Sequence, residues 1–563
     1  MRHAASGSDF ASQRLSWEMM RGASSDKSAS ESALHLIGPA DTSGLATISR
    51  PFGSLAPPTG QRPSTFHVSP FTFHTWYMSV PNQTADLQLS RLVTGNGSVL
   101  RGPILLFFVS GLFWLLVAVA LWLFSAFQVT DPFSPLVFPD VAWLTYGRVY
   151  PVAMDLLVYG WVSMIGVGAA IWILDSMAEN PLPGGYLPLL AGIIWNLGLV
   201  FGVWGVLGGG STGKEWLEFP IYAAFPIWLA EIIMAIWAVA LVIGRRSKAG
   251  YISQAFLLTA FIAFAWAYGS ANGFLQFFKV SGPAEPAIQW WYFGCLVSLW
   301  LTPLGVGMVY HFVPLLIGRP LYSAKLAAIS FWGIVAFGGW TGIAQILGAP
   351  LPAWIQTVSV VANVLLVVPV LAFATNLHLT MKGSFDLIKP NLALRFLVTG
   401  GLVFGLASIW NAITTFRSIN RILEFTWAIT ARTDLFLIGF MTLVCFGAIY
   451  YILPRLVGRS WRYTKLIQMH FWFSIVALGT LVFDLTIAGV MQGFGEMDPQ
   501  VSFAAVIDLG KPFMLGYGLA AIFLGLSALL GLGAFLTVFV NPAWAPDSEE
   551  APEPVINEEV SLA

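Results

Sequence analysis

Long apolar stretches recur along the sequence from residue 103 to residue 540, separated by short polar segments. A stretch of roughly 20 apolar residues, folded as an α-helix, spans the hydrocarbon core of a bilayer and satisfies its own backbone hydrogen bonds there. Charged residues make up only 10% of the chain and hydrophobic residues 57%, whereas soluble domains carry about a quarter charged residues. The sequence therefore predicts an all-α integral membrane protein, a bundle of twelve transmembrane helices.

The predicted membrane domain covers residues 100–541. Its twelve helices are expected over residues 103–127, 150–174, 186–208, 219–244, 254–278, 290–317, 325–347, 355–381, 394–416, 433–455, 466–491 and 512–540. Residues 1–90 are rich in Ser, Pro and Thr and lack periodicity, which predicts a disordered N-terminal leader. Met78 is a candidate for the true start within it. Residues 542–563 are predicted to form an acidic, solvated tail.

Lys and Arg gather in loops that follow even-numbered predicted helices. Because positively charged loops stay in the cytoplasm, both termini are predicted to be cytoplasmic, with the chain in the inner membrane. The net charge of −1 gives no argument for a nucleic-acid partner. The expected partner is the lipid bilayer. The basic residues are Arg245, Arg246, Lys248, Arg319, Lys325, Lys382, Lys389, Arg455, Arg459, Arg462 and Lys465.

Several motifs between Trp290 and Arg455 keep a fixed order and spacing. WWY is followed after a long apolar run by YHFVP, then by PLYSAKL, LPAWIQT, LHLTMKG, NLALRFLVTG and GAIYYILPRLVGR, and TYGRVYP lies earlier. Over about residues 100–540 this pattern resembles subunit I of the haem–copper oxidase superfamily, in particular the catalytic subunit of cbb3-type cytochrome c oxidase. The resemblance implies a twelve-helix fold, a place in respiratory electron transport, and partner subunits such as a c-type cytochrome.

The resemblance also implies two haems and one copper ion. In the family, one haem is held by two His and passes electrons. The other haem has one His and faces a copper ion held by three His, and dioxygen is reduced between the two metals. Neutral imidazole suits both metals, and the identity of the axial ligand sets the potential and reactivity of a haem.

None of the six positions that match these ligands holds a histidine. The positions matching haem ligands are Ala153, Arg432 and Asp434, and those matching copper ligands are Gly294, Ala344 and Gln345. The sequence therefore predicts that the chain binds neither haem nor copper.

The seven histidines lie elsewhere in the sequence. His3, His35, His67 and His74 fall in the predicted leader, and His311, His378 and His470 fall at predicted cytoplasmic helix ends. The latter three are expected to be interfacial, and the alternative is a new metal site on that side. Met154 and Cys295 adjoin lost ligand positions but point about 100° away on a helix, so they are expected to pack rather than to bind metal.

Charged residues within the predicted spans need a partner or a cavity. Two interpretations of Arg432 stand open: an ion pair with Asp155, or a side chain that reaches the outer membrane surface. Glu231 and Asp484, together with Asp155, are candidates for a proton route because intramembrane carboxylates often serve in one.

Three functions stay open on the sequence alone. The favoured one is a non-catalytic homologue that acts as a scaffold or as a proton or solute conduit in a respiratory system. The first alternative is an active terminal oxidase or nitric oxide reductase with divergent metal ligands, and the second is a transporter unrelated to redox chemistry. Bulky side chains in the interior favour the scaffold, and an aqueous path along the buried carboxylates favours transport.

Overall fold

The apolar stretches fold into helices at the predicted places. The computed structural model describes residues 98–130, 141–178, 185–244 and 251–540, and every regular element within them is a helix. The predicted leader with Met78 and four of the histidines, the predicted tail and the basic residues 245–248 lie outside the described residues.

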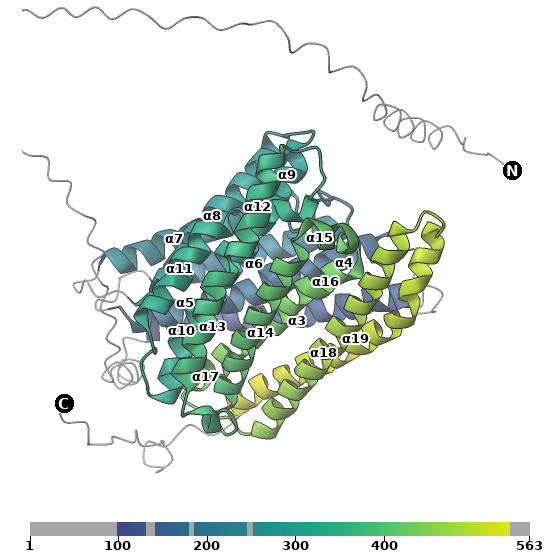
Figure 1. The fold of residues 1–563 in the computed structure, drawn as a ribbon. Coiled ribbons are helices and arrows are strands. Elements are labelled where there is room, and N and C mark those ends of the chain that lie inside the picture. The colour runs from purple at the N-terminus through teal and green to yellow at the C-terminus, as the bar shows by residue number, and fades with distance from the viewer. Residues whose placement is uncertain (1–97, 131–140, 179–184, 245–250, 541–563) are drawn as a thin grey trace, which may run out of the picture. The chain divides into compact units, whose positions relative to one another are not determined.

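Eleven helical segments within the described residues are long and apolar enough to cross a membrane. The helices are α3 (Ser98–Thr130), α4 (Tyr146–Asp155), α5 (Ser163–Ser176), α6 (Tyr186–Leu207), α7 (Ile221–Ile243), α8 (Ile252–Asn272), α9 (Ala284–Cys295), α10 (Thr302–Ile317), α11 (Ala324–Gly338), α12 (Ala353–Leu365), α13 (Val367–Met381), α14 (Leu392–Thr414), α15 (Arg417–Leu423), α16 (Trp427–Asp434), α17 (Leu443–Val457), α18 (Thr464–Met497) and α19 (Phe503–Val540). Figure 1 shows α18 and α19 packed side by side along the bundle.

Three of the spans are inner helices surrounded by the others. The most apolar part of Tyr146–Ser176 is entirely buried, and that of Ala284–Ile317 and of Trp427–Val457 is 89% buried. The same measure is 33–56% for the remaining spans, which expose one face with side chains such as Phe113, Trp204 and Leu515. Three inner helices with a lipid-facing ring around them therefore make up the bundle.

Each inner helix changes from α-helix to π-helix partway along. The π-helical segments are Leu156–Val162 between α4 and α5, Leu296–Leu301 between α9 and α10, and Leu435–Thr442 between α16 and α17. Single turns of π-helix occur frequently at functional sites. In all three helices the segment begins directly after a residue that the sequence singles out: Asp155, Cys295 and Asp434.

The seventh predicted helix differs from its prediction of residues 325–347. The α-helix α11 ends at Gly338, and a 3₁₀ turn, Gly342–Ile346, follows it. A Cβ atom on Gly342 would overlap the carbonyl oxygen of Trp290, so the turn packs directly against the backbone of α9. Apolar residues continue through this turn, and their pattern hides the break.

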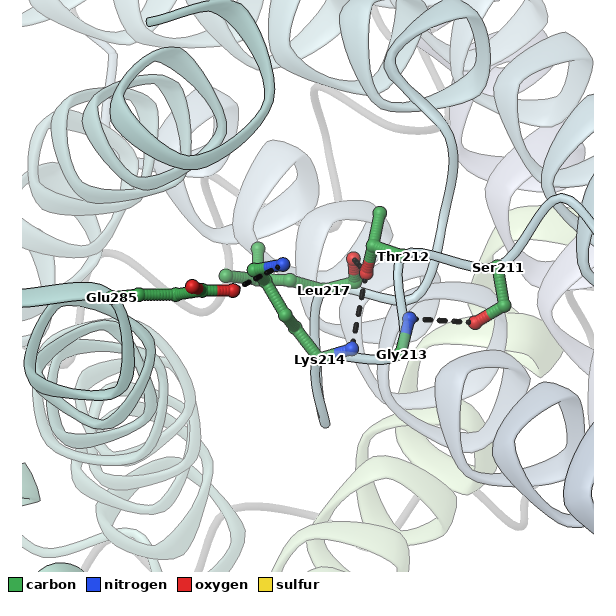
Figure 2. A network of polar contacts seen from close by, with 6 residues as sticks. All are labelled: Ser211, Thr212, Gly213, Lys214, Leu217 and Glu285. Atoms are coloured by element: carbon green, nitrogen blue, oxygen red, sulfur yellow. Dashed lines mark hydrogen bonds and ion pairs between the residues drawn. The ribbon is translucent and has the colours of Figure 1, made fainter. Parts of the chain in front are cut away.

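The loop between α6 and α7 is attached to the start of α9, as Figure 2 shows. Lys214 Nζ lies 2.9 Å from Glu285 Oε1 in α9. Thr212 Oγ1 accepts a hydrogen bond from the Lys214 N–H (3.1 Å) and donates one to the Leu217 carbonyl (2.7 Å). These contacts fix Trp216 and Glu218 at the end of the bundle where α9 begins.

Candidate functional site

A cavity lies where the inner segments α9 and α16 meet α12, α14 and the turn Gly342–Ile346. The volume not filled by atoms is about 910 Å³, which includes the solvent-open region at the mouth of the cavity. Three of the six positions that match metal ligands line it: Gly294, Gln345 and Arg432. We call this space the Arg432 cavity. The remaining three positions, Ala153, Ala344 and Asp434, are buried outside the lining.

Gly294 has no room for a side chain. A Cβ atom there would stand 2.5 Å from the backbone nitrogen of Gly342 and 2.8 Å from Thr341 Oγ1. Contacts under 3.0 Å with backbone atoms require the chain to move, since a close-packed interior yields little. The backbone of the 3₁₀ turn therefore occupies the place that a side chain of residue 294 would take.

Arg432 is buried, with 6% of its surface exposed. Its Nη1 donates to Thr414 Oγ1 (2.9 Å) and its Nη2 donates to Gln345 Oε1 (2.5 Å). Both partners are neutral. The ion pairs formed within the described residues are Lys214–Glu285 and Lys511–Asp508. Within the described residues Arg432 therefore forms no ion pair with Asp155, and its buried side chain does not extend to the outside of the bundle.

Neutral polar side chains build the wall opposite Arg432. Asn363 Nδ2 donates to the Thr341 carbonyl (2.9 Å), and Ser359 Oγ donates to the same carbonyl (2.9 Å). Asn411 Nδ2 in turn donates to Asn363 Oδ1 (2.7 Å). The N–H of Ala344 donates to Ser359 Oγ (2.8 Å), so this network holds the 3₁₀ turn in place.

These wall residues were missed by reasoning from the sequence. A signal for them exists, because Gln356, Ser359 and Asn363 recur at intervals of three and four residues within an apolar run. Such spacing puts all three on one face of a helix, which is how α12 presents them to the turn.

Glu424 is the acidic group that faces Arg432 from the loop between α15 and α16. Its Oε2 accepts a hydrogen bond from Asn420 Nδ2 (2.5 Å). Burial raises the pKa of the Glu424 carboxyl to about 7, against the opposing effect of Arg432 and Asn420.

Asp434 occupies a different interior site from Arg432. Two residues apart on a helix, the two side chains point in different directions. Asp434 is 1% exposed and its Oδ2 has no hydrogen-bond partner within the described part of the chain. Its electrostatic neighbours are Tyr146, Tyr150 and Tyr517, so we call this region the tyrosine site.

Aromatic rings pack tightly around the tyrosine site. The rings of Tyr146 and Tyr150 are stacked with centroids 5.3 Å apart, and Trp122 Nε1 donates to the Tyr517 hydroxyl (2.5 Å). Trp427 lies 5.9 Å from the Tyr517 ring. Ala153, on the same inner helix as Tyr146 and Tyr150, is fully buried.

Asp155 faces acidic groups and tyrosines rather than an arginine. Neither of its carboxylate oxygens has a hydrogen-bond partner in the segments described. Burial raises the pKa of Glu218 well above its usual value, and the nearby Asp155 raises it further. The Tyr159 hydroxyl donates to the Trp216 carbonyl (2.5 Å) and shares a hydrogen bond with the Tyr292 hydroxyl (2.8 Å) beside this group.

The other carboxylates proposed for a proton route are separate from this group. Glu231, on α7, is fully buried, and neither carboxylate oxygen has a partner among the residues with described side chains. Asp484, on α18, lies against Gly516 of α19. Within the described segments, no hydrogen bond joins Asp155, Glu231 and Asp484 to one another, so a proton route through them stays a prediction.

The described histidines are not gathered into a metal site. His311 packs against Trp172 and Phe312, His378 lies near Phe385, and His470 Nδ1 is 2.5 Å from the Tyr450 hydroxyl. Within the described ranges, no three His, Cys, Asp or Glu side chains are arranged to hold a metal ion. Met154 and Cys295 are both buried in the core, as packing requires.

Comparison with known proteins assigns the family. Residues 102–527 match the family model of cytochrome c and quinol oxidase polypeptide I. A cytochrome c oxidase subunit 1 homolog of Azorhizobium caulinodans is 23% identical over 480 residues, covering 82% of this chain and 84% of the relative. The cbb3-type cytochrome c oxidase subunit CcoN1 of Stutzerimonas stutzeri is 24% identical over 396 residues, covering 68% and 81%.

A solved structure supports the fold. The cryo-EM structure of a heme-copper terminal oxidase dimer matches with a TM-score of 0.62 and 13% identity, covering 83% of this chain and 86% of that chain. The resemblance predicted from the sequence motifs is therefore confirmed. With eleven candidate membrane spans among its described residues and relatives that include a cbb3-type subunit, this chain belongs to the cytochrome c and quinol oxidase polypeptide I family, subunit I of the haem–copper oxidases.

Proposed function

We propose that this chain is a ligand-depleted subunit I homologue that binds neither haem nor copper and acts as a non-catalytic membrane scaffold. The observation that carries this proposal is the hydrogen bond between Arg432 and Gln345, 2.5 Å long. Arg432 shares its cavity with two positions that match copper ligands, so it corresponds to the axial ligand of the haem that faces copper. In the family that haem stands between its axial ligand and the copper ion.

Two side chains in direct contact leave no space between them for a haem. The donor chemistry agrees with this geometry. A guanidinium has five N–H hydrogen-bond donors and no lone pair with which to bind a metal. Gly294 and Ala344 have no side-chain atom that could act as a metal ligand. The residues present at these positions therefore do not suit the family's cofactors.

The packing at Gly294 supports the same proposal. A histidine at this position would need the space that the Gly342 backbone fills. The site has thus been rebuilt around the small residue, and returning one ligand would not recreate a copper site.

The scaffold proposal includes a location and partners. We place the chain in the bacterial inner membrane with both termini in the cytoplasm. Arg319 Nη1 donates to the Lys382 carbonyl (3.3 Å), so two basic loops meet at one end of the bundle, which would face the cytoplasm. Other respiratory subunits, such as a c-type cytochrome, are the proposed partners. A proton or solute conduit is the alternative role, and it is favoured by the carboxylates of Asp155 and Glu231, which are buried and have no hydrogen-bond partner among the described residues.

The test is an absorption spectrum of the purified chain, with iron and copper measured on the same sample. A haem-containing oxidase produced in the same host serves as the control for haem supply. We expect no Soret band and only trace metal. A Soret band with near-stoichiometric iron would overturn the proposal. Co-purification of respiratory subunits from the native membrane tests the scaffold role, and recovery of the chain without any of them contradicts that role.

A further inference from the structure

We propose that the Arg432 cavity binds a small oxyanion, of the nitrate or short-chain carboxylate class, held by the Arg432 guanidinium. The inference rests on the proposed function, because it requires the cavity to be free of haem and copper. The inference goes beyond the proposed function because it assigns to this cavity a ligand of defined charge and shape.

The guanidinium has donors to spare. Of its five N–H groups, the hydrogen bonds to Thr414 and Gln345 take two. The side chain lines the cavity and is otherwise buried. A guanidinium fork matches the two oxygens of a planar oxyanion, and such charge-assisted hydrogen bonds are about twice as strong as neutral ones.

The charge of Arg432 is poorly compensated by the protein. No carboxylate within the described residues lies within ion-pairing distance of it, since the two ion pairs found there involve other residues. Glu424 faces it from the loop, where its carboxylate is bonded to Asn420. A buried cation without an ion pair is costly, and an anion from solution would supply the missing charge.

The rest of the lining suits an anion better than a cation. The lining combines apolar side chains with neutral polar groups, the latter contributed by Ser298, Thr302, Thr341, Asn363, Ser408 and Asn411. No Asp or Glu is among the residues that line the cavity. The positive charge of Arg432 would repel a metal cation, and an apolar guest would leave that charge without a counter-ion.

Nitrate is the probe for the test, and titration calorimetry on the detergent-solubilised full chain is the measurement. Ionic strength is held constant with sodium chloride, whose spherical anion lacks the two oxygens that a guanidinium fork matches. We expect saturable binding with one site per chain. Iron and copper are measured on the same sample, so that the failure of the proposed function is recognised separately.

Variants identify the site. Arg432→Lys should weaken nitrate binding about tenfold because it loses the fork, and Arg432→Gln should abolish it. Ser408→Leu fills part of the lining while leaving Arg432 intact, and it should also abolish binding, which keeps the test decisive if Arg432→Gln does not fold. Arg417→Gln is the matched control. This arginine is exposed at the same end of the bundle and bonds Thr357, so its loss should leave nitrate binding unchanged.

The outcomes separate cleanly. Loss of binding in Arg432→Gln and Ser408→Leu, with binding kept in Arg417→Gln, supports the site. No saturable binding by metal-free wild-type chain overturns this inference and leaves the proposed function standing. Equal binding by all variants assigns nitrate to the general surface and overturns it as well. Stoichiometric iron overturns both proposals.

Discussion

The Arg432 cavity and the tyrosine site are two solutions to the same problem within one inner helix. Arg432 and Asp434, one basic and one acidic residue, are both buried and lie two residues apart, yet they do not meet. Arg432 is surrounded by neutral amides and hydroxyls beside open space. Asp434 is surrounded by aromatic rings, and one of its oxygens has no hydrogen-bond partner in the described structure.

The difference teaches how a membrane interior accommodates a charge. At the Arg432 cavity, polar side chains from α12 and α14 replace water as hydrogen-bond partners, and the charge is kept at moderate cost. At the tyrosine site, packing has closed around the carboxylate without supplying all its partners, and this leaves a desolvation cost. We expect the first site to be more sensitive to changes of shape and the second to gain from removal of charge.

Gly294→Ala tests the close packing of the Arg432 cavity and should have the largest effect. The new methyl group would clash with the backbone of Gly342, so we expect a loss of about 3 kcal/mol or more in unfolding free energy. Unfolding of the purified variants in detergent measures it. Gly405→Ala is the matched control, because Gly405 is helical and buried with no atom within 4 Å of an added Cβ. Similar losses in both variants would contradict the packing argument.

Arg432→Leu tests how much the hydrogen bonds of Arg432 stabilise the Arg432 cavity. It leaves Gln345 Oε1 and Thr414 Oγ1 without their donor, and we expect a loss of about 2–3 kcal/mol. Arg417→Leu, at an exposed position, should change stability by less than about 0.5 kcal/mol. If Arg432→Leu is as stable as wild type, its hydrogen bonds do not stabilise the cavity and the contrast with Asp434 disappears.

Asp434→Asn tests the tyrosine site and should act in the opposite direction. The amide keeps the shape of the side chain and removes a buried ionisable group, so we expect a gain of about 1–2 kcal/mol. Asp508→Asn, at an exposed ion pair with Lys511, is the control and should change stability by less than about 1 kcal/mol. A loss of stability in Asp434→Asn shows instead that the carboxylate is well satisfied by the tyrosines.

Glu424→Gln gives the smallest effect and a defined pH dependence. Because the pKa of Glu424 is raised from 4.5 to about 7 in the folded state, the folded wild-type chain holds this proton more tightly than the unfolded chain does. Wild-type stability therefore falls, relative to the variant, as the pH rises from 4.5 to 7, and the difference levels off above 7. We expect a gain on the order of 1 kcal/mol for the variant at pH 8. Unfolding measured at pH 5 and pH 8 checks it, and a constant difference contradicts it.

The spans were predictable because their length and apolarity encode them directly. The predicted helix over residues 186–208 is observed as Tyr186–Leu207, and that over 219–244 as Ile221–Ile243. The break of the seventh helix was hidden because apolar residues run on through the 3₁₀ turn. Side-chain partners between helices were not predictable either. Gln345 lies far from Arg432 in sequence, and the two meet only because the turn is packed against α9 and α12, within reach of the Arg432 side chain.

Each π-helical segment divides its inner helix into two halves whose side-chain directions can be set separately. The half before the segment is α4, α9 or α16. It carries Asp155 in α4, residues 289–294 in α9, and Arg432 with Asp434 in α16, and the half after the segment packs among the other helices. Since one residue corresponds to about 100° of rotation, an insertion or deletion within a segment would turn the residues of the first half to a new direction while the second half stays in place. A single-residue change within such a segment would therefore redirect interior side chains of this chain without rebuilding the bundle.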